Sequence, residues 1–99
     1  MKVYLDDERK APLGWIQTRW PSDTIELLKT EEVTELSLDH DLGDDQRGTG
    51  YEVLLWIEQA VVDGFDPPKM KVHSANTSAR VKMEAAILSI ERLKCKKDR

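Results

Sequence analysis

Carboxylates follow directly after two short strand-like runs of this chain. Asp6 and Asp7 come after residues 3–5 (Val-Tyr-Leu), and Asp39 comes after residues 36–38 (Leu-Ser-Leu). In open α/β sheets ligands bind outside the carboxyl ends of the strands, so we expect these acids to meet at one edge. Carboxylates that close repel one another at neutral pH, and a divalent cation is the simplest compensation. An all-oxygen ligand set favours Mg²⁺ or Mn²⁺ over Zn²⁺, and these three aspartates are its candidate ligands.

Both histidines of the chain stand beside expected strand ends. His40 follows Asp39, and His73 closes the fourth strand-like run. Because histidine exchanges protons near neutral pH, both are catalytic candidates together with Asp39. Neighbouring side chains along a strand point to opposite faces. Either the strand ends at Asp39, or His40 faces elsewhere and Asp41 joins the metal ligands. The same alternation separates His73 from Ser74.

A second group of residues could hold phosphate oxygens near these acids. They are polar side chains near the strand ends and a backbone N–H at the end of a glycine-rich loop: Arg9, Gly50, Ser74 and Asn76. Backbone N–H groups at helix starts and arginine side chains both bind phosphate. Arginines also form ordinary surface ion pairs and glycines also make turns, so a purely structural role stays open. Trp15, Trp20 and Trp56 could stack on bases, but packing in the core or at a partner surface is the commoner use and the one we favour.

The residues between these groups predict a regular alternation of strands and helices. Strand-like composition and alternation occur at residues 2–5, 15–20, 35–38 and 69–73. Apolar residues at helical spacing, with caps and breakers at their ends, predict helices at 21–29, 51–62 and from Asn76 or Thr77 to about Leu93. Strands that alternate with helices favour parallel pairing with right-handed crossovers. If the first strand lies between the second and third, the acids and Ser74 meet at one edge and the strand order is 2-1-3-4.

The size and charge of the chain limit its possible functions. Its 99 residues suit one domain, 1–99, with a mostly basic tail from about Lys94. A formal net charge of −4 argues against a broad surface for long duplex nucleic acid. The single cysteine, Cys95, indicates a reducing compartment, no apolar run could cross a bilayer, and the N-terminus is too short for a signal peptide. We expect a cytoplasmic protein without membrane contact, and so small a core leaves room for a homodimer through a sheet edge.

Four motifs resemble those of known receiver domains. Leu-Asp-Asp-Glu (5–8), Leu-Asp (38–39) and His-Ser-Ala (73–75) resemble the strand ends of response-regulator receivers. The chain is more similar to a shortened family, the cyclic-phosphate processing receiver-like domain, over roughly residues 2–90. The motifs that carry this resemblance are Tyr-Leu-Asp-Asp-Glu-Arg (4–9), Ser-Leu-Asp-His-Asp-Leu-Gly (37–43), Gly-Thr-Gly-Tyr (48–51) and Val-His-Ser-Ala-Asn (72–76). The resemblance implies an α/β, three-layer flavodoxin/receiver-like fold with a four-stranded parallel sheet of order 2-1-3-4. The helix between the first two strands, the fifth strand with its lysine, and the fifth helix have no counterpart.

The same resemblance implies metal-assisted phosphoester chemistry, namely hydrolysis of a cyclic phosphate on a nucleotide or RNA end, as in RNA repair. Opening a cyclic phosphodiester needs a base, an acid for the leaving oxygen, and positive charge near the phosphoryl oxygens. In this interpretation the acids hold Mg²⁺ or Mn²⁺, the histidines move protons and Ser74 binds phosphate. Two alternatives stay open: a non-catalytic degenerate receiver that binds a metal or a protein partner, and a phosphoacceptor domain that uses Asp39. The absent lysine counts against two-component signalling.

Overall fold

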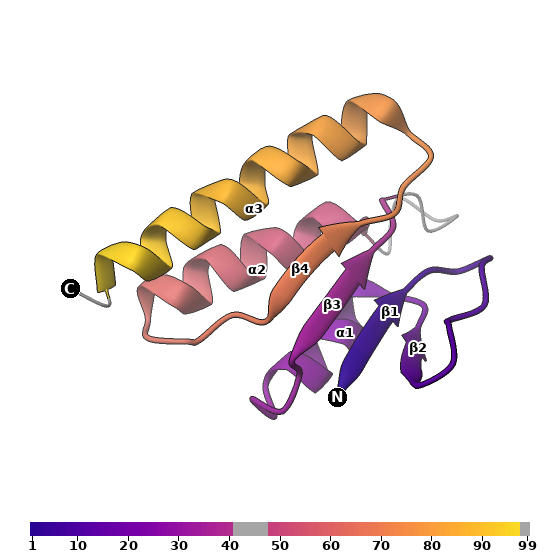
Figure 1. Cartoon of the computed structure of the whole chain (residues 1–99), viewed down its shortest axis with the longest axis horizontal. Coiled ribbons are helices and arrows are strands. Elements are labelled where there is room, and N and C mark those ends of the chain that lie inside the picture. The colour runs from indigo at the N-terminus through magenta and orange to yellow at the C-terminus, as the bar shows by residue number, and fades with distance from the viewer. Residues whose placement is uncertain (41–47, 98–99) are drawn as a thin grey trace.

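Four strands and three helices alternate along the chain in the predicted order (Figure 1). The computed structural model describes residues 1–40 and 48–97. Its elements are β1 (Lys2–Leu5), β2 (Trp15–Thr18), α1 (Pro21–Leu28), β3 (Glu35–Leu38), α2 (Gly50–Val62), β4 (Lys69–Val72) and α3 (Thr77–Lys97). The predicted positions therefore hold within a few residues, and α3 continues into the expected basic tail. None of the helices in these two ranges is long and apolar enough to span a membrane.

Strand β2 ends earlier than predicted because the chain turns there into α1. The hydroxyl of Thr18 is buried and lies 2.8 Å from the hydroxyl of Thr24 in α1. Trp20 is the N-cap residue of α1, with an extended backbone, and its carbonyl accepts the N–H of Thr24 at 3.2 Å. Pro21 follows in the first helical position, where its missing N–H costs nothing. The prediction of a strand through Trp20 was wrong at its end, because capping prevailed over β-favouring residue types.

The strands form one parallel sheet in the order β2-β1-β3-β4. This confirms the predicted sheet and its strand order. The ladder continues one residue beyond the assigned strands. There the N–H groups of Asp6, Asp39 and His73 each donate to a carbonyl of the neighbouring strand, at 3.0, 3.0 and 2.9 Å. These three residues therefore form one row across the carboxyl edge of the sheet.

One face of the sheet shares a hydrophobic core with all three helices. Alternate residues of the central strands have no exposed surface: Val3, Leu5, Leu36 and Leu38. They pack with apolar side chains from the helices: Leu28, Val53, Leu54, Ile57, Val61, Met83, Ile87 and Ile90. Full burial of a side chain of this size contributes about 1.5–3 kcal/mol. This face is therefore the main source of hydrophobic stabilisation.

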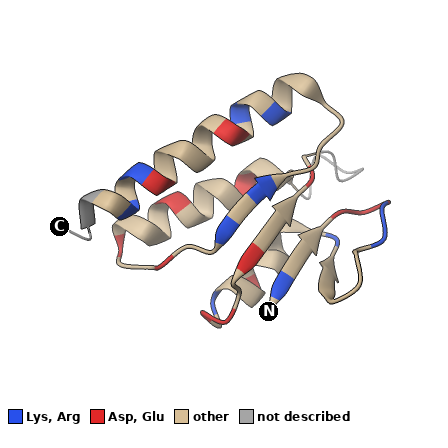
Figure 2. Cartoon of the chain, in the orientation of Figure 1, with Lys and Arg blue, Asp and Glu red and all other residues tan. Residues whose placement is uncertain are grey.

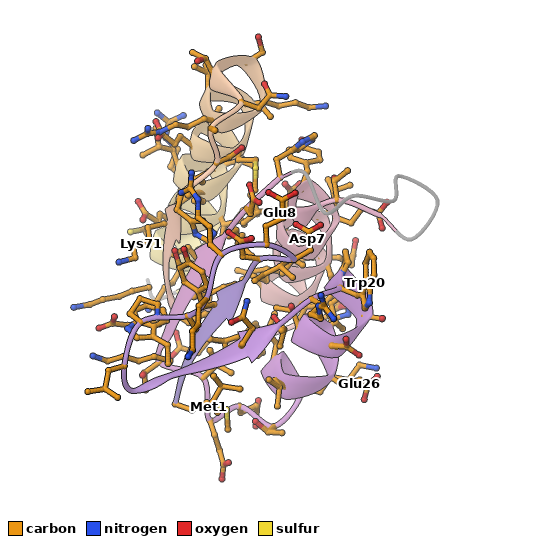
Figure 3. All side chains as sticks on the ribbon, turned by 90° about the vertical axis from the view of Figure 1, so that its right-hand side faces the viewer. Met1, Asp7, Glu8, Trp20, Glu26 and Lys71 are labelled. Carbon is orange, nitrogen blue, oxygen red and sulfur yellow. The ribbon has the colours of Figure 1, made fainter. Side chains whose placement is uncertain are left out.

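The opposite face of the sheet is covered by no helix in the described part of the chain. Figure 3 shows α1 and α2 on one side of the sheet and the Lys71 side chain on the other. The β2–β3 and β3–β4 connections run in the same direction across the sheet, so right-handed crossovers place α1 and α2 on one face. Only the β1–β2 connection runs the other way, and residues 6–14 form a loop there. The α/β class and the parallel sheet are confirmed, but the expected third layer is not formed.

Candidate active site

Three side chains converge at the carboxyl edge of the sheet. One ligand atom from each of Asp6, Asp39 and His73 lies within 4.8 Å of the others. The convergence follows from the register, because the three residues share one row across the sheet. Each also stands an even number of residues after a side chain on the face that no described helix covers, so all three side chains point to that face. The alternation that left His73 and Ser74 as rivals is thereby decided by the geometry, with His73 in the row.

Asp6 is the most enclosed member of this group, with 1% of its surface exposed. Its Oδ1 accepts the backbone N–H groups of Glu8 and Arg9, both at 2.8 Å, and so shapes the turn after β1. Its Oδ2 lies 3.1 Å from Nε2 of His73. Hydrogen bonds to an ionised carboxylate offset the free-energy cost of burying it. Oδ1 of Asp6 therefore holds the loop, and Oδ2 faces His73.

The imidazole of His73 is held on both nitrogens and against one ring face. Nε2 meets Asp6, and Nδ1 lies 2.7 Å from Oγ of the fully buried Ser37. The ring of Tyr4 stacks on the imidazole, with centroids 4.1 Å apart and planes 4° apart. These contacts hold the ring in one orientation, as second-shell partners do for metal-binding histidines.

Burial makes His73 a neutral imidazole at neutral pH. Desolvation lowers the pKa of His73 below its ordinary value, and the charge of Arg9 acts in the same direction. The hydrogen bond that His73 donates to Asp6 and the charges of Asp6 and Asp39 raise this pKa but do not outweigh burial. With the Asp6 carboxylate as acceptor, Nε2 carries the single ring proton and the Ser37 hydroxyl donates to Nδ1. The unprotonated charge state is the one that can bind a metal.

The loop after β1 places the guanidinium of Arg9 beside the row of Asp6, Asp39 and His73. Nη1 of Arg9 donates to the backbone carbonyl of His73 at 3.3 Å. The Gln17 side chain braces the loop: its Nε2 donates to the carbonyls of Asp6 and Arg9, at 2.8 and 2.7 Å, and its Oε1 accepts the N–H of Ala11 at 2.8 Å. Arg9, a predicted phosphate ligand, therefore lies next to the acids and His73.

Two other predicted phosphate ligands shape the turn between β4 and α3. Oγ of Ser74 is buried and accepts the N–H of Asn76 at 3.1 Å. Oδ1 of Asn76 accepts the N–H of Ala79 at 3.1 Å, which makes Asn76 the N-cap of α3, one of the two capping residues predicted. Both side chains follow His73 directly, so this turn sets the distance between the group and the start of α3.

Gly50 is the residue that lets α2 begin against Asp39. A Cβ atom at position 50 would lie 1.8 Å from the backbone oxygen of Asp39, so only glycine fits without a backbone shift. The N–H of Gly50 donates to the carbonyl of His40 at 3.2 Å. Gly50 was predicted to bind phosphate through this N–H, which the structure shows engaged with the chain itself.

The remaining predicted residues do not join the converging ligand atoms or lie outside the described residues. Asp7 stands in the turn after β1, where its carbonyl accepts a guanidinium hydrogen bond from Arg19 at 3.5 Å (Figure 3). Neither Asp7 nor His40 belongs to the set of converging ligand atoms in the described ranges. Asp41, the alternative to His40 beside Asp39, lies outside the described residues.

Two residues of the site, Tyr4 and Ser37, were missed by sequence reasoning. Each stands two positions before an aspartate of the row, Tyr4 before Asp6 and Ser37 before Asp39. Side chains two apart on a strand share a face, so the period of two could have identified both as neighbours of the group. A tyrosine and a serine also stand out among the apolar residues of these short strands.

Comparison with known proteins identifies one family. The family model of the cyclic-phosphate processing receiver domain matches residues 1–89, which includes every element up to most of α3. No curated protein and no solved structure was found to match the chain. The match therefore rests on the domain as a whole, with the row of Asp6, Asp39 and His73 inside it.

Proposed function

The chain belongs to the family of cyclic-phosphate processing receiver domains, and from this premise we propose that it is a metal-dependent phosphoesterase. Its substrate is a cyclic phosphate on a nucleotide or at the end of an RNA. The observation that carries the proposal is the row of Asp6, Asp39 and His73, in which two carboxylates and a neutral imidazole converge within 4.8 Å. The family name describes the processing of cyclic phosphates; the hydrolytic and metal-dependent character is our inference from the row.

The donor set fits a divalent metal ion. Oδ2 of Asp6, the carboxylate of Asp39 and Nε2 of His73 are the atoms that would hold it. Atoms that lie within 4.8 Å of one another are close enough to share one ion. An imidazole nitrogen in the set favours Mn²⁺ over the Mg²⁺ expected from oxygen ligands alone. When bound, such an ion would withdraw charge from the phosphoryl oxygens and lower the pKa of a water molecule on it.

The chain's own residues prepare His73 for this role. Without an ion, Nε2 holds a proton toward Asp6, and Ser37 donates to Nδ1. For Nε2 to hold an ion, the ring proton would have to lie on Nδ1, where the Ser37 hydroxyl can accept it. Metal affinity would then fall once the pH is low enough to protonate the imidazole on both nitrogens. Proton transfer by His73 to the leaving oxygen is the alternative role. A metal-binding titration of His73→Ala separates the two roles, because the affinity falls if His73 is a ligand and is retained if it only moves protons.

Two groups near the row could orient the phosphate. Arg9 is exposed, and its guanidinium group touches the backbone of His73, so it can form charge-assisted hydrogen bonds to phosphate oxygens. The hydroxyl of Ser74 accepts one hydrogen bond from the chain and has its own proton to donate. Both would place the cyclic phosphate over the row rather than supply the chemistry.

A cytoplasmic location also stays a prediction.

The test is an assay with a 2′,3′-cyclic nucleotide and Mn²⁺ or Mg²⁺, in which the monophosphate is measured by chromatography. We expect turnover that EDTA stops and that Asp39→Asn abolishes, while Asp63→Asn, a change at an exposed carboxylate beyond α2, leaves it intact. Absence of turnover with metal binding retained would favour a non-catalytic regulatory module. A stable phosphoryl adduct after treatment with acetyl phosphate, lost in Asp39→Asn, would instead favour a phosphoacceptor.

A further inference from the structure

The face of the sheet that lacks helices carries aromatic and basic side chains. We call it the open sheet face and define it by the residues that alternate with the core positions: Lys2, Tyr4, Trp15, Gln17, Glu35, Ser37, Lys69 and Lys71. The three lysines are exposed, and the two aromatic rings are half-buried. In an ordinary doubly wound sheet this face would be covered by helices and apolar. Its composition here suits contact with water or with a polar ligand.

Trp15 differs from the other two tryptophans of the chain. Trp20 and Trp56 pack against the hydrophobic core, whereas Trp15 is not among the side chains that do so. Trp15 lies edge-on to Tyr4, with centroids 6.3 Å apart at 80°. The ammonium groups of Lys71 and Lys2 lie 5.0 and 5.8 Å from its ring centroid. We favoured packing in the core or at a partner surface for all three tryptophans, and for Trp15 the core is not the place.

The open sheet face is positively charged although the chain as a whole is acidic. Lys2, Lys69 and Lys71 outnumber the one carboxylate, Glu35 (Figure 2). Glu35 is paired in register with Lys2 on one side and Lys69 on the other, so lysines flank its charge. The chain as a whole has a formal net charge of −4, so the excess of positive charge on this face is local. It complements an anionic ligand.

The face is continuous with the candidate active site. Trp15 touches Tyr4, and Tyr4 stacks on His73 of the row. From the register row of Lys2 to that of Asp6 is four residues, or about 13 Å of strand. This length has room for at most about four nucleotides at the ~3.4 Å spacing of a stacked strand. A hollow of about 190 Å³ between Trp15, Lys69 and Lys71 lies at the end of the open sheet face that is farther from the candidate active site.

We propose that the open sheet face binds the nucleotides that precede a cyclic-phosphate end, so that the substrate is a short single-stranded RNA. Trp15 stacks on a base, and Lys2 and Lys71 contact backbone phosphates. Single-stranded nucleic acids are bound by this combination of aromatic platforms and a basic track, without readout of sequence. The proposal rests on the proposed function for the position of the RNA end, and it adds the substrate class.

The test is binding of a 5′-fluorescein uridine tetranucleotide with a 2′,3′-cyclic phosphate end, measured by anisotropy in EDTA so that no turnover is required. We expect Trp15→Leu to raise the dissociation constant about tenfold, the low part of the range for one base stack. Lys71→Gln raises it several-fold and weakens its dependence on salt. Trp15→Phe keeps most of the affinity, and Lys29→Gln, at an exposed lysine at the end of α1, changes nothing. Circular dichroism of each variant confirms that it is folded.

Three outcomes separate this proposal from the proposed function. Binding that depends on Trp15, with no hydrolysis of any cyclic phosphate, would contradict the proposed enzymatic activity and support RNA binding by the open sheet face. Turnover of cyclic mononucleotides with no preference for the tetranucleotide, in wild type and Trp15→Leu alike, would overturn RNA binding by the open sheet face and support the proposed enzymatic activity. A dimer that light scattering detects and that Trp15→Leu dissociates would also overturn it, because a second copy would then cover the face.

Discussion

The two faces of the sheet are built from the same strands but by different kinds of residue. On one face Leu5 and Leu38 have no exposed surface and pack against three helices. On the other, Tyr4 and Ser37 hold His73, and the next row contains the converging carboxylates. Residues adjacent in sequence therefore lie on opposite faces, one that supplies the core and one to which we assign the proposed chemistry. The comparison predicts that substitutions one position apart will have separable effects.

The largest expected effect is on the covered face, at Leu38. Leu38→Ala removes a fully buried side chain and leaves a cavity, which should lower the free energy of unfolding by about 2–5 kcal/mol. Urea denaturation followed by circular dichroism measures it. Leu88→Ala is the matched control, because Leu88 on α3 is 55% exposed, and its loss should be under ~1 kcal/mol. Equal losses at the two leucines would contradict the assignment of the core to this face.

One position further, Asp39→Asn should have little effect on stability and a large one on metal binding. The change removes a negative charge from the group but keeps the shape of the side chain, so the free energy of unfolding should stay within about 1 kcal/mol of wild type. Affinity for Mn²⁺ in calorimetry should fall by more than the ~10–100-fold seen for loss of an outer-shell partner. Asp63→Asn is again the control. A large loss of stability without loss of metal affinity would make Asp39 a structural residue.

The separation of Leu38 from Asp39 also shows which features of the fold could be read from sequence. Apolar runs that end in acids indicated the strands, and alternation with helical segments indicated a parallel sheet whose carboxyl ends meet. Asp6, Asp39 and His73 could be selected because each follows such a run. The third layer was expected from resemblance rather than from residues, and the short loop after β1, already visible in the sequence, has no room for the helix that would form it.

Other features of the site could not be predicted because they depend on tertiary contacts. The choice of His73 over Ser74 needed the register between β3 and β4, which sets the face of each side chain. The engagement of the Gly50 N–H with His40 follows from the close approach of α2 to the end of β3. Propensity and spacing describe one segment at a time, whereas these contacts join segments far apart in the chain.

A smaller effect is expected at Ser37, a buried polar residue on the open face. Ser37→Ala removes the partner of Nδ1 of His73, so the ring loses one of the contacts that orient it. Loss of such a partner should lower Mn²⁺ affinity by about 10–100-fold. Ser89→Ala, at an exposed serine of α3, is the control. Unchanged affinity in Ser37→Ala would mean that stacking on Tyr4 and the contact with Asp6 suffice to hold the imidazole.

The smallest expected effect is the dependence of stability on pH without metal. Burial lowers the pKa of His73, so the unfolded chain takes up this proton at a higher pH than the folded chain. The contribution to stability is therefore fully present above the ordinary histidine value of 6.5 and is lost as the pH falls through the lower folded pKa. Urea unfolding in EDTA at pH 7.5 and ~5.5 should show a larger decrease for wild type than for His73→Gln, while His40→Gln controls for the loss of a histidine elsewhere. An equal decrease in the free energy of unfolding of wild type and His73→Gln would assign the acid sensitivity to the carboxylates that both proteins share. His73 would then make no contribution to the pH dependence of stability.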